Sequence, residues 1–211
     1  MVVYIVGSVG GGRAGMGDVE VGQVRLHVGV AGFSVVAGIV FTVTSHWVAP
    51  LAFAAGGHLG VALVYGLWFM GGPLTAYIVR RPWSAFLGET VGAIVELLLV
   101  SPYSIMLYYY GPAQGIVSEA VFRAFRYRNF GYKAMILAGG LPALAAYPFD
   151  CLISPFYPAC RSPGYPLELH IGLIAGMAVS GAVLAGVLVK VVVDSAVSSG
   201  ALRSWPVARM K

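Results

Sequence analysis

The sequence predicts an all-α membrane protein with six transmembrane helices and with the N- and C-termini both cytoplasmic. Three observations lead to this fold class. Of the 211 residues, 59% are hydrophobic and 10% are charged, whereas about a quarter of the residues in a soluble domain are charged. Six apolar stretches are long enough for a membrane span, which takes about 20 residues. The basic residues fall almost entirely in the connections on one side of these stretches.

The six predicted spans follow one another along one transmembrane domain at residues 26–193. A flexible N-terminal tail at 1–25 precedes this domain, and a cytoplasmic tail at 194–211 follows it. Only three residues separate the third span from the fourth, which predicts a tight helical hairpin. The spans cover Leu26–Ser45, Gly60–Val79, Trp83–Val100, Ser104–Phe122, Tyr132–Ile153 and His170–Val193.

The N-terminal tail does not have the pattern of a signal peptide. Its apolar run is short, no basic region precedes it, and a glycine-rich stretch follows. Gly10, Gly12 and Gly15 formally match a dinucleotide-binding pattern, but no βαβ unit follows them. We therefore expect a flexible tail, or a chain whose true start is Met16.

The distribution of basic residues predicts the orientation of the spans. Of the 13 Lys and Arg residues, all but Arg161 lie on the side of the tails: in the tails, in the connections that face the same side, or, for Lys133 and Lys190, at the adjoining ends of spans. Cytoplasmic loops carry the Lys and Arg excess, so both termini are expected in the cytoplasm. No basic face is formed, which argues against nucleic-acid binding and leaves the lipid bilayer as the surrounding partner.

Two cysteines, Cys151 and Cys160, lie on the predicted outer side. An oxidising exterior permits a disulfide between them, and two free thiols remain the alternative because their distance cannot be obtained from the sequence. Two cysteines without neighbouring histidine motifs do not suggest a zinc site. We expect neither a metal nor a cofactor.

Polar residues within the predicted spans suggest a ligand site. A charge inside a membrane costs at least ~2.5–3.5 kcal/mol, so each one requires an explanation. Aromatic, carboxylate and imidazole groups concentrate in the outer third of the predicted bundle. The alternatives are an interfacial belt for the aromatic residues, plain exposure for the histidines, and helix-to-helix hydrogen bonds for Glu96 and Gln114. The candidate ligand-binding residues are Trp47, Glu96, Tyr103, Tyr110, Gln114, Tyr147, Asp150 and His170.

No catalytic motif of the zinc-protease, serine-hydrolase or P-loop type occurs in the sequence. The chain is therefore not expected to be an enzyme, and any active transport would require an energising partner or an ion gradient. Two alternatives remain open. One is a membrane enzyme that uses the intramembrane carboxylates Glu89 and Glu119, and the other is a purely structural membrane subunit.

Several motifs in the middle of the chain form a recognisable set. They are Gly66-Leu67-Trp68-Phe69, Arg81-Pro82 with Glu89, Glu96, Gln114-Gly115 with Glu119 and Phe122, and Arg126-Tyr127-Arg128. This set resembles the YkoE family of substrate-binding S components of energy-coupling factor (ECF) transporters. The resemblance extends from about Leu26 to Asp150 and departs from the family pattern at Trp83 and in the turn at Val100–Ser104.

This resemblance implies uptake of thiamin or its hydroxymethylpyrimidine precursor from outside. It also implies a transmembrane T component and paired cytoplasmic ATPases as partners. Glu96 suits this ligand, because a carboxylate complements the ring nitrogen and exocyclic amine of an aminopyrimidine. Ser34 and Gly38 form a small-residue pair that is expected to bind the T component. An S component for another small vitamin or nucleobase remains the alternative.

Overall fold

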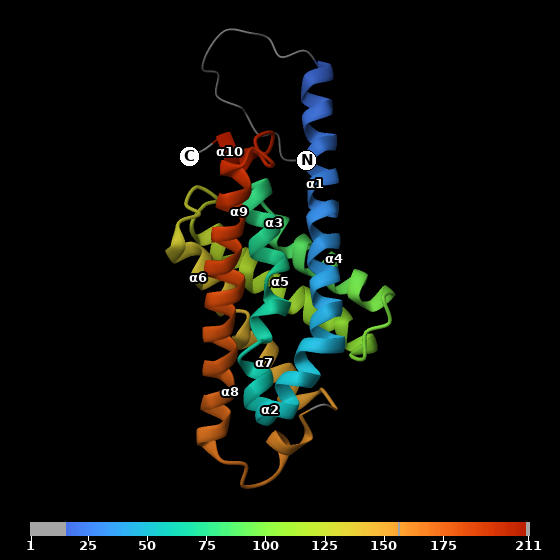
Figure 1. Cartoon of the computed structure of the whole chain (residues 1–211), viewed down its shortest axis with the longest axis vertical. Coiled ribbons are helices and arrows are strands. Elements are labelled where there is room, and N and C mark those ends of the chain that lie inside the picture. The colour runs from blue at the N-terminus through green and yellow to red at the C-terminus, as the bar shows by residue number, and fades with distance from the viewer. Residues whose placement is uncertain (1–15, 156, 210–211) are drawn as a thin grey trace.

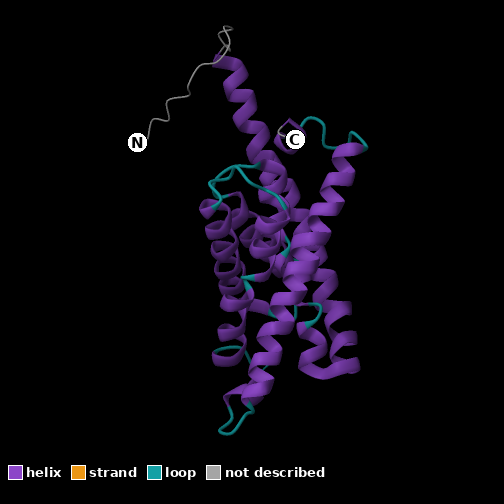
Figure 2. Cartoon of the chain, turned by 90° about the vertical axis from the view of Figure 1, so that its left-hand side faces the viewer, coloured by secondary structure: helices purple, strands orange, loops and turns teal. Residues whose placement is uncertain are grey.

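The computed structural model describes residues 16–155 and 157–209, with side chains from His27 onward. The helices of this part of the chain form an elongated bundle, and no strand occurs among these residues (Figures 1 and 2). The α-helices are α1 Met16–Val43, α2 Ala49–Ala62, α3 Gly71–Val79, α4 Ser84–Leu98, α5 Leu107–Ala124, α6 Tyr132–Gly140, α7 Ala143–Leu152, α8 Leu167–Ser180, α9 Val189–Ser198 and α10 Pro206–Arg209. Two π-helical segments, Thr44–Val48 and Gly181–Leu188, connect α1 to α2 and α8 to α9.

Three helical rods in the described chain are long and apolar enough to cross a membrane. They are His27–Ala62, Tyr132–Leu152 and Leu167–Ser198. The first contains 36 residues but is divided by non-helical backbone at Gly56 and Gly57, and the last contains 32 residues. At 1.5 Å per residue, residues 27–55 and 167–198 are each longer than a hydrocarbon core of roughly 30 Å. The structure thus confirms an all-helical fold with several membrane helices, whereas helix length alone does not establish six spans.

The first difference from the sequence expectation lies at residues 46–59, which we predicted to form an outer loop. They continue α1 through a π-helical turn into α2, because the segment is apolar and carries no Lys, Arg, Asp or Glu. The chain bends within α2 at Gly56 and Gly57, which have non-helical backbone angles. Gly57 has a φ of 59°, a conformation that glycine adopts without strain.

The predicted second and fifth spans are interrupted. Residues 60–79 contain the end of α2, a 3₁₀ turn at Tyr65–Phe69 and the nine-residue α3. The fifth span is divided into α6 and α7 at Leu141 and Pro142, because proline has no backbone N–H to continue the helical ladder. The sixth begins earlier and ends later than predicted, in the rod Leu167–Ser198.

The predicted hairpin between the third and fourth spans is confirmed, because α4 and α5 pack against each other. On its other side α4 packs against α1, and the small pair Ser34 and Gly38 lies in this contact. Ser34 is fully buried, and a Cβ atom added at Gly38 would lie 2.7 Å from the backbone oxygen of Gly92. The pair that we expected to bind a partner thus allows two helices of the same chain to approach closely.

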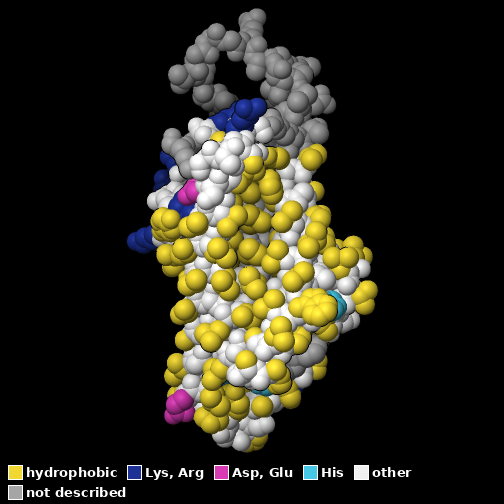
Figure 3. All heavy atoms as spheres, in the orientation of Figure 1, with side chains coloured by type: hydrophobic (Ala, Val, Ile, Leu, Met, Phe, Trp, Pro, Cys, Tyr) yellow, Lys and Arg dark blue, Asp and Glu magenta, His cyan; other side chains and the backbone are white. Residues whose placement is uncertain are grey.

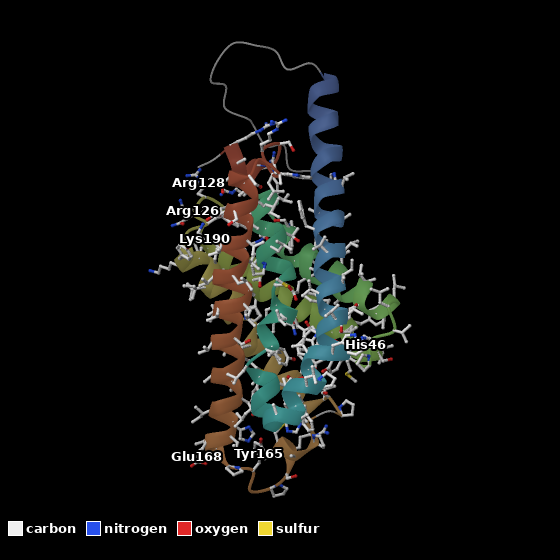
Figure 4. All side chains as sticks on the ribbon, viewed as in Figure 1. His46, Arg126, Arg128, Tyr165, Glu168 and Lys190 are labelled. Atoms are coloured by element: carbon white, nitrogen blue, oxygen red, sulfur yellow. A yellow bond between two sulfur atoms is a disulfide. The ribbon has the colours of Figure 1, made fainter. Side chains whose placement is uncertain are left out.

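Charged and apolar side chains separate along the long axis (Figure 3). Apolar side chains cover the middle of the visible face, and basic side chains gather near the end where α10 lies. Arg126 and Arg128 lie toward this end, whereas Tyr165 and Glu168 lie at the opposite end (Figure 4). The separation resembles that of a membrane protein with its basic end on one side of the bilayer.

Candidate ligand-binding cavity

A narrow cavity of about 40 Å³ lies among the helices. Most of its wall is aromatic or aliphatic, and a few carboxyl, amide and hydroxyl groups enter it. Its walls come from α1, α2, the 3₁₀ turn, α4, α5, α7 and two connections. The lining residues are Phe41, Val61, Tyr65, Trp68, Glu89, Ala93, Glu96, Tyr103, Leu107, Tyr110, Gly111, Gln114, Asp150 and Tyr157.

Glu96, on α4, is held by two hydroxyl groups. Ser45 and Ser101 both donate hydrogen bonds to its Oε1, the latter over 2.8 Å. The indole of Trp68 donates in turn to Ser45 Oγ over 3.0 Å. Ser45 belongs to the π-helical segment Thr44–Val48, a distortion that often occurs at functional sites. A buried carboxylate is thereby fixed in one orientation at the cavity wall.

Asp150, on α7, lines another part of the wall. Tyr110 donates a hydrogen bond of 2.5 Å to its Oδ1. No described group meets the geometry of a hydrogen bond to its Oδ2, and the hydroxyl of Tyr157 is likewise buried without a partner. Buried polar atoms are nearly always hydrogen-bonded, so two unpaired polar atoms at one cavity wall suggest that a ligand pairs with them.

Glu89 lines the cavity and also has a structural role. Its Oε2 accepts a 2.6 Å hydrogen bond from the backbone N–H of Gly72, in the first turn of α3. The carboxylate therefore satisfies a donor that the helix cannot satisfy itself. Its Oε1 has no hydrogen-bond partner among the described residues.

Glu119 also caps a helix, but it does not line the cavity. It accepts hydrogen bonds from the backbone N–H groups of Trp83 and Phe86 at the start of α4, over 2.7 and 3.5 Å. Arg123 and Tyr127 donate to the same carboxylate over 2.9 and 2.5 Å. Both of its oxygens are thus occupied by the protein itself.

Aromatic rings shape the remaining wall. Tyr103 packs edge-on against Trp68 with ring centroids 5.5 Å apart, and Gln114 is 4% exposed beside them. Burial, with Asp150 nearby, raises the pKa of the Tyr103 and Tyr157 phenols. These hydroxyl groups therefore stay protonated and can donate hydrogen bonds at physiological pH.

The disulfide joins the end of α7 to the connection that follows it. Cys151 and Cys160 are bonded, with their Cα atoms 5.5 Å apart. Tyr157 lies inside the loop that this bond closes, and its side chain reaches the cavity. The bond thus restrains a segment that supplies part of the wall.

Five of the predicted ligand-binding residues line this cavity, and three do not. Trp47 is 69% exposed, because it points away from the side of the π-helical segment that carries Ser45. Tyr147 and His170 hydrogen-bond to each other and do not line the cavity. The five that it brings together are Glu96, Tyr103, Tyr110, Gln114 and Asp150.

The sequence prediction missed several lining residues, among them Phe41, Tyr65, Trp68 and Tyr157. The spacing of Tyr65 and Trp68 in the sequence could have indicated that both line the cavity. Residues three apart share one face of a 3₁₀ turn, so an aromatic pair at this spacing would have pointed to a common wall. The role of Tyr157 had no such signal, because it depends on the disulfide.

Comparisons with known proteins agree with this architecture. A family described as "ABC-type cobalt transport system, permease component" matches residues 27–145. The "Putative HMP/thiamine permease protein YkoE" of Bacillus subtilis (strain 168) is 34% identical over 176 residues, which cover 83% of this chain and 85% of that protein.

A solved structure extends the agreement from sequence to fold. The "Crystal structure of an S-component of ECF transporter" superimposes with a TM-score of 0.79 at 28% identity, over 88% of this chain and 91% of that one. The similarity thus covers the helices that build the cavity. The chain belongs to the YkoE-type family of S components of ECF transporters, which are multi-pass proteins of the cell membrane.

Proposed function

We propose that this chain captures thiamin or its hydroxymethylpyrimidine precursor from outside the cell. A transmembrane T component and cytoplasmic ATPases would then drive uptake. Family membership supports the role of a substrate-binding subunit with such partners, and the name of the Bacillus subtilis relative supports the ligand class.

The composition of the cavity wall is the observation that carries the proposal. Acceptor groups from Glu96, Gln114 and Asp150 stand among the rings of Trp68 and Tyr110. An aminopyrimidine presents an amine donor beside a ring-nitrogen acceptor. Carboxylate oxygens accept from the amine, and an amide NH₂ can donate to the ring nitrogen. A thiazolium cation is attracted to aromatic faces and to carboxylates. The unpaired Oδ2 of Asp150 supplies a further acceptor for such a ligand.

A metal ion fits the described residues less well than an organic ligand. No group of three or more His, Cys, Asp and Glu suited to a metal occurs in the part of the chain that the structure describes. The cavity wall contains no histidine or cysteine, and nitrogen and sulfur ligands are those preferred by cobalt-like transition metals. An organic cation or amine therefore matches the wall better than cobalt does.

The membrane-enzyme alternative has less support, because both of its candidate carboxylates hold helix ends. Glu119 is fully engaged as the cap of α4, and Glu89 caps α3 through one oxygen. A carboxylate that already satisfies a helix end is poorly placed to exchange protons with a substrate. Another small vitamin or nucleobase remains a second candidate, because any ligand with a ring-bound amine would match the same acceptors.

The proposal includes six membrane crossings with both termini in the cytoplasm. The position of the basic side chains near α10 supports this orientation (Figure 3). A reporter fused after Lys211 should be cytoplasmic, and a single cysteine label near Arg161 should react from outside in a cysteine-free background. An outward C-terminus, or an Arg161 site that reacts only from inside, would contradict the orientation.

Binding can be tested directly on the detergent-purified protein. Isothermal titration with thiamin, hydroxymethylpyrimidine, cytosine and Co²⁺ would compare the ligand classes. We expect saturable binding of thiamin or hydroxymethylpyrimidine and no comparable binding of Co²⁺. Tight binding of Co²⁺ alone would contradict the proposal, and tight binding of cytosine alone would favour the second candidate.

A further inference from the structure

An open hollow of about 460 Å³ lies toward the basic end of the bundle. It shares no lining residue with the ligand cavity. The end of α3, the connection between α5 and α6, and α9 form its walls. Its lining residues are Tyr77, Arg80, Arg128, Asn129, Phe130, Gly131, Lys190 and Asp194.

The hollow carries an excess of positive charge. Arg80, Arg128 and Lys190 line it, and Asp194 is the single acidic residue of its wall. Lys190 donates a hydrogen bond of 3.0 Å to Asp194, and the hydroxyl of Tyr77 donates to the same carboxylate over 2.7 Å. One carboxylate therefore offsets one of three cations, and two positive charges remain in excess.

Arg80 and Lys190 also lie close to aromatic rings, which do not neutralise a positive charge. The guanidinium of Arg80 lies 4.8 Å from the ring centroid of Phe130 and 5.3 Å from that of Tyr77. The ammonium of Lys190 lies 5.2 Å from the ring centroid of Tyr132. Cation–π contacts orient a cation and leave its charge in place, so the site is shaped in advance for an anion.

The position of Lys190 along its helix places the hollow near a membrane surface. The rod Leu167–Ser198 rises roughly 35 Å from its first residue to Lys190 at 1.5 Å per residue, which is close to the hydrocarbon thickness of about 30 Å. Val183, in the π-helical segment that precedes Lys190, is 51% exposed. Beside it, Tyr132 and Ile136 of α6 are 51% and 37% exposed. An apolar outer surface thus leads to the basic hollow.

We propose that this hollow binds a phosphate group, carried either by an anionic phospholipid headgroup or by a soluble phosphate. Arginine guanidinium groups bind phosphate oxygens through two parallel hydrogen bonds. Basic pockets between membrane helices on the cytoplasmic side bind anionic headgroups. The exposed apolar side chains of Val183 and Ile136 favour the lipid, because acyl chains can lie on them while the phosphate enters the hollow.

Native mass spectrometry of the full-length detergent-purified protein tests this site. Phosphatidylglycerol, phosphatidylcholine and inorganic phosphate are added in separate titrations to the wild type and to Arg128→Gln, Arg126→Gln and Asp194→Asn. Arg126 is an exposed arginine of the same connection that does not line the hollow, so its variant is a matched control for charge.

We expect preferential binding of phosphatidylglycerol, and Arg128→Gln should weaken it about five-fold, the effect of one basic residue near an anionic headgroup. Arg126→Gln should leave it within about two-fold. Asp194→Asn keeps an acceptor for Tyr77 but removes the negative charge, so it should strengthen binding. A merely structural role for Asp194 predicts no such gain.

The other outcomes distinguish a lipid site from a soluble-phosphate site and from non-specific surface attraction. Saturable binding of inorganic phosphate that depends on Arg128, without a preference for phosphatidylglycerol, would assign the hollow to a soluble phosphate. Equal losses in Arg128→Gln and Arg126→Gln would show general surface attraction and overturn the proposal. The absence of both a phosphatidylglycerol preference and phosphate binding would also overturn it.

Discussion

Replacing Glu96 with glutamine tests the assignment of the ligand cavity most directly. The side chain is 1% exposed, and its Oε1 accepts hydrogen bonds from Ser45 and Ser101. Glutamine has nearly the same shape and keeps an oxygen for both hydroxyl groups. The other carboxylate oxygen becomes an amide nitrogen, which donates where the carboxylate accepted. An amine on the ligand would then face a donor in place of an acceptor.

The expected loss follows from the strength of a hydrogen bond to a charged group, about 1.5–3 kcal/mol. This free energy corresponds to an increase of about 10- to 150-fold in the dissociation constant. The protein should still fold, because the two serines retain their acceptor and a charge has been removed from the membrane. Isothermal titration with thiamin and hydroxymethylpyrimidine would measure the loss, and thermal unfolding would verify the fold.

Two further variants complete the test. Glu168 is exposed at the end of the bundle opposite the basic residues, and Glu168→Gln should leave affinity unchanged. Ser101→Ala removes one of the two donors that orient Glu96, and a loss of about 1 kcal/mol would weaken binding about five-fold. Glu89 is less suitable as a control because it lines the same cavity. If Glu96→Gln binds as tightly as the wild type, Glu96 serves helix packing and the reasoning is refuted.

Three other substitutions have defined outcomes. The double change of Cys151 and Cys160 to serine frees the segment that carries Tyr157, so it should lower the unfolding midpoint by an amount equivalent to ~2–4 kcal/mol and weaken ligand binding in titrations. Glu119→Ala leaves the donors at the start of α4 without an acceptor and should cost about 2–4 kcal/mol in denaturant unfolding, whereas the folded fraction should bind ligand normally. A Cβ at Gly181 would lie 2.2 Å from a backbone oxygen of α6, so Gly181→Ala should lower the unfolding midpoint by several degrees, and an unchanged midpoint would show that the helices can move apart.

The sequence predicts the helical membrane fold well because composition and charge act over whole segments. It fails where a single residue interrupts a helix that remains apolar on both sides. Hydropathy does not detect the break at Pro142 or the bend at Gly57, since both lie inside apolar runs. For the same reason, the sequence predicts a loop at 46–59, whereas the segment is helical except at Gly56 and Gly57.

The candidate site is predictable where depth and helix face determine which groups meet. Tyr110 and Gln114 are four residues apart on α5 and line one wall together, as helical spacing requires. Trp47 lies only two residues from Ser45, but its side chain is on the opposite side of the helix. Sequence distance to a polar group thus does not place a side chain in the cavity. The contribution of Tyr157 depends on a disulfide that the sequence left undecided.

The hydrogen bonds of the buried carboxylates separate structural roles from binding roles. A carboxylate within a membrane bundle is tolerated when donors meet its oxygens. Both oxygens of Glu119 are met by backbone N–H groups, an arginine and a phenol, so nothing remains for a ligand. Glu89 and Asp150 each have one oxygen that is satisfied and one that is buried without a partner. Both residues line the cavity, so a ligand with hydrogen-bond donors could pair with these two oxygens.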